Sequence, residues 1–187
     1  MNTPNKLTLL RILMVPACIA CLMIPQLPHR FLWTLILFCL AAVTDYVDGK
    51  LARKNNQVTD FGKFLDPLAD KMLVCSILIC FIELELAPAI AVVCIIFREF
   101  AVSSLRLVAM SSGTVIAANI WGKIKTVCQM VGIIVILLGK ELEIYEILPT
   151  SLNFGAWCTG ILWFIAGITV ISGITYVVAN RGSLKTK

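Results

Sequence analysis

Two runs of residues decide the fold: Asp45-Tyr-Val-Asp48-Gly49-Lys-Leu-Ala52-Arg53 and Gly62-Lys-Phe-Leu-Asp66-Pro-Leu-Ala-Asp70. Each run adjoins a long hydrophobic segment, and a polar turn at residues 54–60 separates them. A carboxylate at the edge of a membrane span is costly unless it is paired, hydrated or bound to a cation, so it is interpreted as functional. The stretch therefore predicts two membrane helices joined by a polar turn, with a functional site beside that turn.

The composition excludes an ordinary soluble domain. Hydrophobic residues make up 59% of the 187 positions and charged residues 14%, and the mean hydropathy is +0.93. Because about 20 apolar residues cross a hydrocarbon core of roughly 30 Å, the chain has room for about five to seven spans. The sequence therefore predicts an integral membrane protein with one domain over residues 1–187.

We expect an all-α integral membrane fold of six transmembrane helices, preceded by a short N-terminal interfacial helix. The polar start and the length of the first apolar run do not fit a plain signal peptide, so we expect the first span to stay in the mature protein. The expected spans are residues 12–27, 31–47 with a helical continuation to 53, 61–81, 89–108, 116–138 and 154–178, with a polar loop at 140–151.

The eight cysteines all fall in apolar runs. In such runs thiols behave as small hydrophobic side chains. Cys18 and Cys21 have the spacing of a metal or redox pair. They lack a second pair or a nearby histidine, so they are weak candidates.

Basic residues in the short loops predict the orientation in the membrane. One side holds Lys6, Arg11, Lys50, Arg53, Lys54, Lys63, Arg106, Lys123, Lys125, Arg181, Lys185 and Lys187. The other side holds His29, Arg30, Glu83, Glu85, Lys140, Glu141, Glu143 and Glu146. Since cytoplasmic loops carry the excess of Lys and Arg, we expect both termini and the aspartate pairs at the cytoplasmic face of the cell membrane.

The aspartates have the spacing of a metal site. Asp45 and Asp48 are about one helical turn apart, as are Asp66 and Asp70, so each pair projects from one helix face. Two antiparallel helices can bring these faces together, and four carboxylates then need divalent cations, for which Mg²⁺ or Mn²⁺ is suitable. Two such metals about 4 Å apart typically clamp phosphoryl oxygens. The stretch therefore predicts a two-metal site that acts at phosphorus.

Neighbouring residues support this interpretation. Gly49 and Gly62 would be unfavourable inside helices unless something approaches the backbone closely. Arg53 offers a forked donor suited to a diphosphate. The simpler interpretation is a headgroup-level loop with a few salt bridges, but two acidic pairs that each have a glycine nearby favour the functional one.

The pattern Asp45-x2-Asp48-Gly49-x2-Ala52-Arg53-x8-Gly62-x3-Asp66-x3-Asp70 resembles the signature of the CDP-alcohol phosphotransferase family at every fixed position. The resemblance implies a six-helix membrane enzyme, usually a homodimer, that displaces CMP from a CDP-linked alcohol. It also implies that Asp45, Asp48 and Asp66 bind the metal pair and that Asp70 is both a ligand and the base. The positions it implies for CDP-lipid binding are Asn5, Thr8, Gly49, Arg53, Thr59 and Gly62.

Charged residues in the fourth and fifth spans indicate the acceptor. Ionised groups such as Arg98 and Glu99 are costly within a span. A buried ion pair between them is the simpler interpretation, but we disfavour it because adjacent helical residues do not face one another. Lys123 and Lys125 are equally well explained as snorkelling lysines. The alternative is a basic cluster of Arg98, Arg106, Lys123 and Lys125 that binds an anionic acceptor.

The stretches around Arg98 to Arg106 and around Lys123 to Lys125 also resemble those of the bacterial branch of the family that uses glycerol 3-phosphate. The expected reaction then transfers a phosphatidyl group from CDP-diacylglycerol to sn-glycerol 3-phosphate in phospholipid biosynthesis, with two divalent cations and no nucleic acid. An alternative acceptor is inositol phosphate, serine or phosphatidylglycerol. An alternative of another class is a metal-ion transporter. Against it, the acids gather at one membrane face beside Arg53, and Glu99 is the one acid at mid-depth in the other spans.

Overall fold

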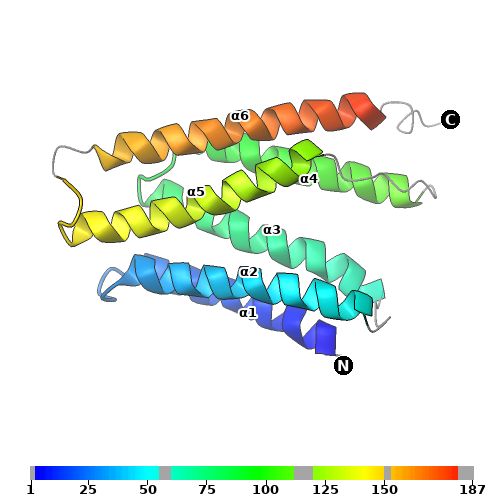
Figure 1. Cartoon of the computed structure of the whole chain (residues 1–187), viewed down its shortest axis with the longest axis horizontal. Helices are drawn as coiled ribbons and strands as arrows, with labels where there is room; N and C mark the ends of the chain where they lie inside the picture. Colours follow the sequence, from blue (N-terminus) through cyan, green and yellow to red (C-terminus); the bar gives the residue numbers. More distant parts are fainter. Residues whose placement is uncertain (1–2, 55–59, 112–119, 150–152, 181–187) are drawn as a thin grey trace. The chain divides into compact units, whose positions relative to one another are not determined.

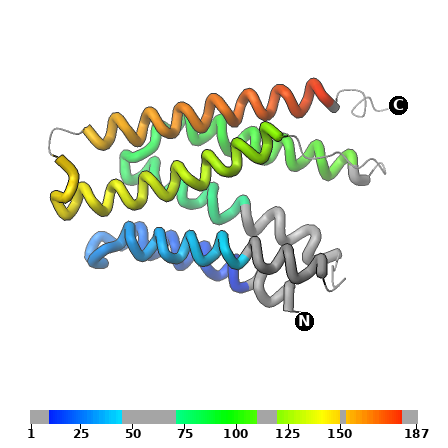
Figure 2. Tube along the Cα trace, viewed as in Figure 1, coloured from blue at the N-terminus to red at the C-terminus, as the bar shows by residue number. Residues whose placement is uncertain are grey.

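The computed structural model describes the backbone at residues 3–54, 60–111, 120–149 and 153–180. It describes side chains at residues 10–44, 71–109, 120–149 and 153–179 (Figure 2). Within these ranges the regular structure is helical throughout, which confirms the all-α prediction there. In chain order the helices are α1 (Thr3–Met23), α2 (Arg30–Lys54), α3 (Asp60–Glu83), α4 (Ala89–Ser111), α5 (Ile120–Ile144) and α6 (Phe154–Asn180) (Figure 1).

Several boundaries differ from the predicted spans, mainly in α1 and α5. Helix α1 ends at Met23, where we expected the first span to continue to residue 27. Helix α1 runs without a break through Pro16, so the predicted short N-terminal helix is not separate from the first span. Helix α5 continues to Ile144, where we expected a loop from residue 140. Lys140 and Glu143 lie about one helical turn apart, and their ion pair, with Nζ 2.6 Å from Oε2, supports this extra turn.

The helices are long, and each exposes large apolar side chains. The shortest has 21 residues, which corresponds to about 32 Å at 1.5 Å per residue. Large apolar side chains are exposed on every helix, among them Leu13, Val43, Ile79, Phe97, Val127 and Phe164. By length and composition, one segment within the described residues qualifies as a span: Phe154–Ala179 of α6, with a mean hydropathy of 2.1. Leu10–Met23 and Arg30–Thr44 are shorter apolar helical segments.

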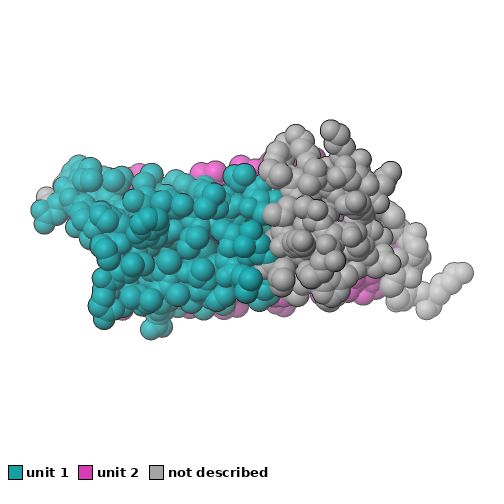
Figure 3. Space-filling model, turned by 90° about the horizontal axis from the view of Figure 1, so that it is seen from below, with its two compact units in different colours: residues 1–83, 134–152 teal, residues 84–133, 153–187 magenta. Residues whose placement is uncertain are grey.

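The chain forms two compact units (Figure 3). Unit 1 comprises Met1–Glu83 and Ile134–Leu152, and unit 2 comprises Leu84–Ile133 and Asn153–Lys187. In unit 1, α1 packs against α2 and α3, and α2 also contacts α3. In unit 2, α4 packs against α6. Buried residues of unit 1 include Cys18, Leu22, Phe31, Phe38 and Phe81, and those of unit 2 include Ile95, Val102, Leu162, Cys158 and Tyr176.

A polar contact joins two ends of helices within unit 1. The buried Glu141 carboxylate near the end of α5 lies 2.7 Å from His29 Nδ1 and accepts a 3.3 Å hydrogen bond from the backbone N–H of Leu32. Tyr145 stacks on the His29 ring with centroids 4.5 Å apart. A carboxylate is favourable at the amino end of a helix, where N–H groups lack partners and the helix dipole is positive. This contact stabilises the part of α5 that lies beyond its predicted end.

Candidate active site

The two predicted acidic pairs lie on α2 and α3, which are neighbours in unit 1. Asp45 and Asp48 belong to the carboxyl-terminal part of α2, and Asp66 and Asp70 to the amino-terminal part of α3. The backbone is helical across each pair, so the spacing keeps its two members on one helix face. Because five residues, 55–59, connect the two helices, their joined ends lie within about 20 Å of each other. The described backbone thus places both pairs on neighbouring helices, and the two-metal site itself stays a prediction.

The side chains of these aspartates lie outside the described residues. The same is true of the side chains of the predicted CDP-lipid residues Asn5, Thr8, Gly49, Arg53 and Gly62, and Thr59 lies outside the described backbone as well. Their roles therefore stay predictions. Among the side chains that are described, no three His, Cys, Asp or Glu residues come together as a metal-binding group.

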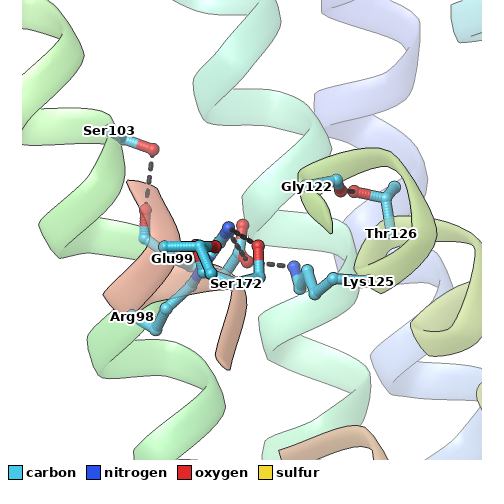
Figure 4. A network of polar contacts seen from close by, with 8 residues as sticks. Arg98, Glu99, Ser103, Gly122, Lys125, Thr126 and Ser172 are labelled. Carbon is cyan, nitrogen blue, oxygen red and sulfur yellow. Dashed lines mark hydrogen bonds and ion pairs between the residues drawn. The ribbon is translucent and has the colours of Figure 1, made fainter. Parts of the chain in front are cut away.

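In unit 2, two cationic side chains converge on one carboxylate (Figure 4). Arg98 Nη1 donates to Glu99 Oε1 at 3.2 Å, and Lys125 Nζ from α5 donates to the same oxygen. The three side chains are only 12%, 14% and 3% exposed, respectively. Burial of ionised groups is unfavourable unless they are paired and hydrogen-bonded. Glu99 therefore acts as the shared counter-ion of both cations.

This geometry corrects the sequence analysis. The ion pair between Arg98 and Glu99, which we disfavoured, is present. The objection from helical spacing was wrong, because an arginine side chain is long enough to bring its guanidinium back to the neighbouring residue. Glu99 belongs to the cluster as much as the cations do, and the signal for it was its position inside an apolar span.

Helix α6 completes the cluster from the other side. Arg98 Nη2 donates to Ser172 Oγ at 2.6 Å. A Cβ atom on Gly173 would lie 3.0 Å from Arg98 Cγ, and one on Gly122 would lie 4.0 Å from Arg98 Nη2. Sequence reasoning missed Ser172. The available signal was a hydroxyl in an apolar helix, one helical turn after the buried Thr169.

An apolar groove of about 440 Å³ lies between α4 and α6. Apart from Arg98 its lining is almost entirely apolar and includes Phe97, Leu105, Gly173, Ile174 and Val178. The methylene stem of Arg98 therefore belongs to an apolar wall while its guanidinium meets Glu99 and Ser172. This is the usual division of a long cationic side chain between apolar and polar surroundings.

The structure assembles half of the predicted acceptor cluster. Arg98 and Lys125 meet at Glu99, whereas Arg106 and Lys123 have exposed side chains and do not join this network within the described residues. Gln129, one turn after Lys125, is buried, and its Nε2 has no partner among the described atoms. The described cluster thus contains two of the four predicted cations, and it is more deeply buried than predicted.

Comparison with known proteins gives a match over nearly the whole chain. Residues 1–175 match the family described as CDP-alcohol phosphatidyltransferase. A Bacillus subtilis protein is 43% identical over 99% of this chain and 98% of its own length. Relatives from Haemophilus influenzae and Rickettsia felis are 37% and 36% identical, covering 98% and 96% of this chain and 95% and 96% of their own lengths. All three are named CDP-diacylglycerol–glycerol-3-phosphate 3-phosphatidyltransferase.

Two solved structures of phosphatidylinositol phosphate synthase from Mycobacterium tuberculosis have a similar fold. The apo form has a TM-score of 0.65 and covers 100% of this chain and 94% of that chain. The complex with manganese and citrate has a TM-score of 0.61 and covers 100% and 87%. Both are 18% identical to this chain, so the similarity concerns the fold. The family match, by contrast, confirms the resemblance found in the aspartate pattern: the chain belongs to the CDP-alcohol phosphatidyltransferase family.

Proposed function

We propose that this protein transfers the phosphatidyl group of CDP-diacylglycerol to sn-glycerol 3-phosphate, giving phosphatidylglycerophosphate and CMP. The observation that carries the proposal is the 43% identity, over nearly the full length of both chains, with the Bacillus subtilis enzyme named for this reaction. The helical placement of both aspartate pairs, on neighbouring helices of one unit, supports it.

Asp45, Asp48, Asp66 and Asp70 would hold two divalent cations. Four carboxylates on two neighbouring helices are a donor set that suits Mg²⁺ or Mn²⁺. When bound, such cations neutralise phosphoryl oxygens and stabilise the leaving group. The manganese in the Mycobacterium tuberculosis complex supports the use of a divalent metal by this fold.

Asp70 would serve as the general base. It accepts the proton of the acceptor hydroxyl while the hydroxyl oxygen attacks the phosphorus that carries diacylglycerol. A new P–O ester bond forms, the bond from that phosphorus to the bridging oxygen of the diphosphate breaks, and CMP leaves with the electron pair. A carboxylate can take this role when it lies within hydrogen-bond reach of the hydroxyl.

The remaining predicted residues would bind the two substrates. Arg53 offers a forked donor to the diphosphate, and further contacts to the CDP-lipid would come from Asn5, Thr8, Gly49, Thr59 and Gly62. The phosphate of glycerol 3-phosphate would bind the cations Arg98, Arg106, Lys123 and Lys125. The contact of both Arg98 and Lys125 with Glu99 in unit 2 brings these two cations together, which supports the assignment for this pair.

We also propose a multi-pass plasma-membrane protein with six spans, cytoplasmic termini and a homodimeric state. The length of the helices and their exposed apolar side chains support the spans. The contact between His29 and Glu141 joins two segments that the charge pattern assigns to the same, outer side. The family match over residues 1–175 runs through both units, which supports one catalytic domain.

A release assay tests the function. Purified protein in detergent, supplied with CDP-diacylglycerol and Mg²⁺ or Mn²⁺, should release CMP when glycerol 3-phosphate is added. Inositol phosphate, serine and phosphatidylglycerol should give much less CMP. A reversed ranking contradicts the acceptor assignment. No CMP with any alcohol, together with metal uptake into liposomes, would instead support a transporter.

A further inference from the structure

The guanidinium of Arg98 is held at two different nitrogens. Nη1 donates to Glu99 Oε1 at 3.2 Å, and Nη2 donates to Ser172 Oγ at 2.6 Å (Figure 4). Because the guanidinium is planar and rigid, two bonds at separate nitrogens determine the direction of its plane. One of these bonds comes from the helix of Arg98 itself and the other from α6.

The same guanidinium has N–H donors that these two bonds do not use. It carries five N–H donors, and its Nε is buried without a partner among the described residues. A buried donor of a charged group without a partner is unfavourable, so a ligand that supplies acceptor oxygens would complete the arrangement. This unused donor is that of Arg98. Lys125 has further interactions besides its bond to Glu99.

The residue after Ser172 provides room for the Arg98 side chain. A Cβ atom at Gly173 would lie 3.0 Å from Arg98 Cγ, so the arginine stem would have to shift by a few tenths of an ångström. Gly167 on the same helix has no atom within 4 Å of the corresponding position. The small size of glycine therefore matters to Arg98 at position 173 and not at position 167.

We propose that Ser172 and Gly173 are positioning residues that direct the Arg98 guanidinium toward the phosphate of the acceptor. Ser172 orients the guanidinium through its hydroxyl, and Gly173 lets the arginine stem pass close to α6. Neither needs to touch the substrate. The inference rests on the proposed function, in which Arg98 binds glycerol 3-phosphate, and it adds α6 to the elements that determine acceptor binding.

Steady-state kinetics of CMP release by the full chain in detergent test the hydroxyl. Ser172→Ala should raise the KM for glycerol 3-phosphate about tenfold, since a hydrogen bond to a charged group is lost. The KM for CDP-diacylglycerol should stay unchanged. The matched control is Thr175→Val, because the Thr175 hydroxyl donates to the backbone carbonyl of Ser172 at 3.1 Å. This variant should keep the wild-type KM for both substrates.

A pair of glycine variants tests separately whether the Arg98 side chain needs the space beside Gly173. Alanine is favourable in a helix, so both Gly173→Ala and Gly167→Ala should fold. Gly173→Ala should raise the KM for glycerol 3-phosphate severalfold without changing that for CDP-diacylglycerol. Gly167→Ala should match the wild type in both values.

The outcomes separate this inference from the proposed function. A wild-type KM for glycerol 3-phosphate in both Ser172→Ala and Gly173→Ala overturns the positioning role. So does an equal loss toward both substrates accompanied by a lower unfolding temperature, which is the result of a merely structural role. A wild-type protein that releases no CMP with glycerol 3-phosphate overturns the proposed function itself.

Discussion

The acidic stretch of α2 and α3 and the basic cluster of unit 2 are built in opposite ways. The acidic pairs fall within 26 consecutive residues, 45–70, and each pair is made by helical spacing alone. The basic cluster joins Glu99 to Lys125 across 26 positions and Arg98 to Ser172 across 74. Pairs that helical spacing makes within one helix can be recognised in the sequence, whereas contacts between side chains of separate helices, such as Arg98 with Ser172, become visible only after folding.

The largest effect expected at the acidic stretch comes from metal removal. Exhaustive chelation with EDTA should abolish CMP release, because four carboxylates without cations repel one another and leave the diphosphate unneutralised. Addition of Mg²⁺ or Mn²⁺ should restore it. Full activity after chelation would contradict metal binding by the four aspartates. The acidic stretch and the basic cluster would then no longer differ in this respect.

Asp70→Asn tests the proposed base directly. We expect kcat to fall by about 10²- to 10⁴-fold, the typical contribution of a positioned general base, while binding of CDP-diacylglycerol remains detectable. The control is Asp60→Asn at the start of α3, outside both pairs, which should keep most of its activity. Wild-type turnover in Asp70→Asn would exclude Asp70 as the base.

Arg98→Ala tests the basic cluster. The KM for glycerol 3-phosphate should rise by about 10- to 100-fold, since charge-assisted hydrogen bonds to the phosphate are lost. The exposed Arg106 supplies the comparison: Arg106→Ala should have a smaller effect on the same KM. If Arg98→Ala changes the KM of both substrates equally, Arg98 is structural and the basic cluster is not an acceptor site.

The smallest effect concerns stability alone. Glu141→Gln should lower the free energy of unfolding by about 1 kcal/mol, because the contact with His29 and the charge at the amino end of α2 are lost. CMP release should not change. Thermal unfolding in detergent measures the difference against Glu143→Gln, whose partly exposed i,i+3 pair with Lys140 should contribute less. A loss of activity in Glu141→Gln at full stability would contradict this purely structural role.

Hydrophobic length predicted the helices well because each span must satisfy its own backbone within about 20 residues. The predicted starts at residues 31, 61, 89 and 154 lie within one residue of the observed ones. The extension of α5 to Ile144 was not predictable in the same way. It coincides with the contact of Glu141 with His29, a residue 112 positions away.

Composition and spacing within single helices are enough to predict the membrane character, the helices, the family and the aspartate pattern. These properties depend on composition and on spacing within single helices, which folding does not alter. The pairing of Arg98 with Glu99, the contact of Lys125 with the same carboxylate, and the approach of Ser172 and Gly173 to the arginine follow from how the helices pack. The physical reason is that buried charges must find partners wherever packing brings them, and spacing along one helix does not encode those partners.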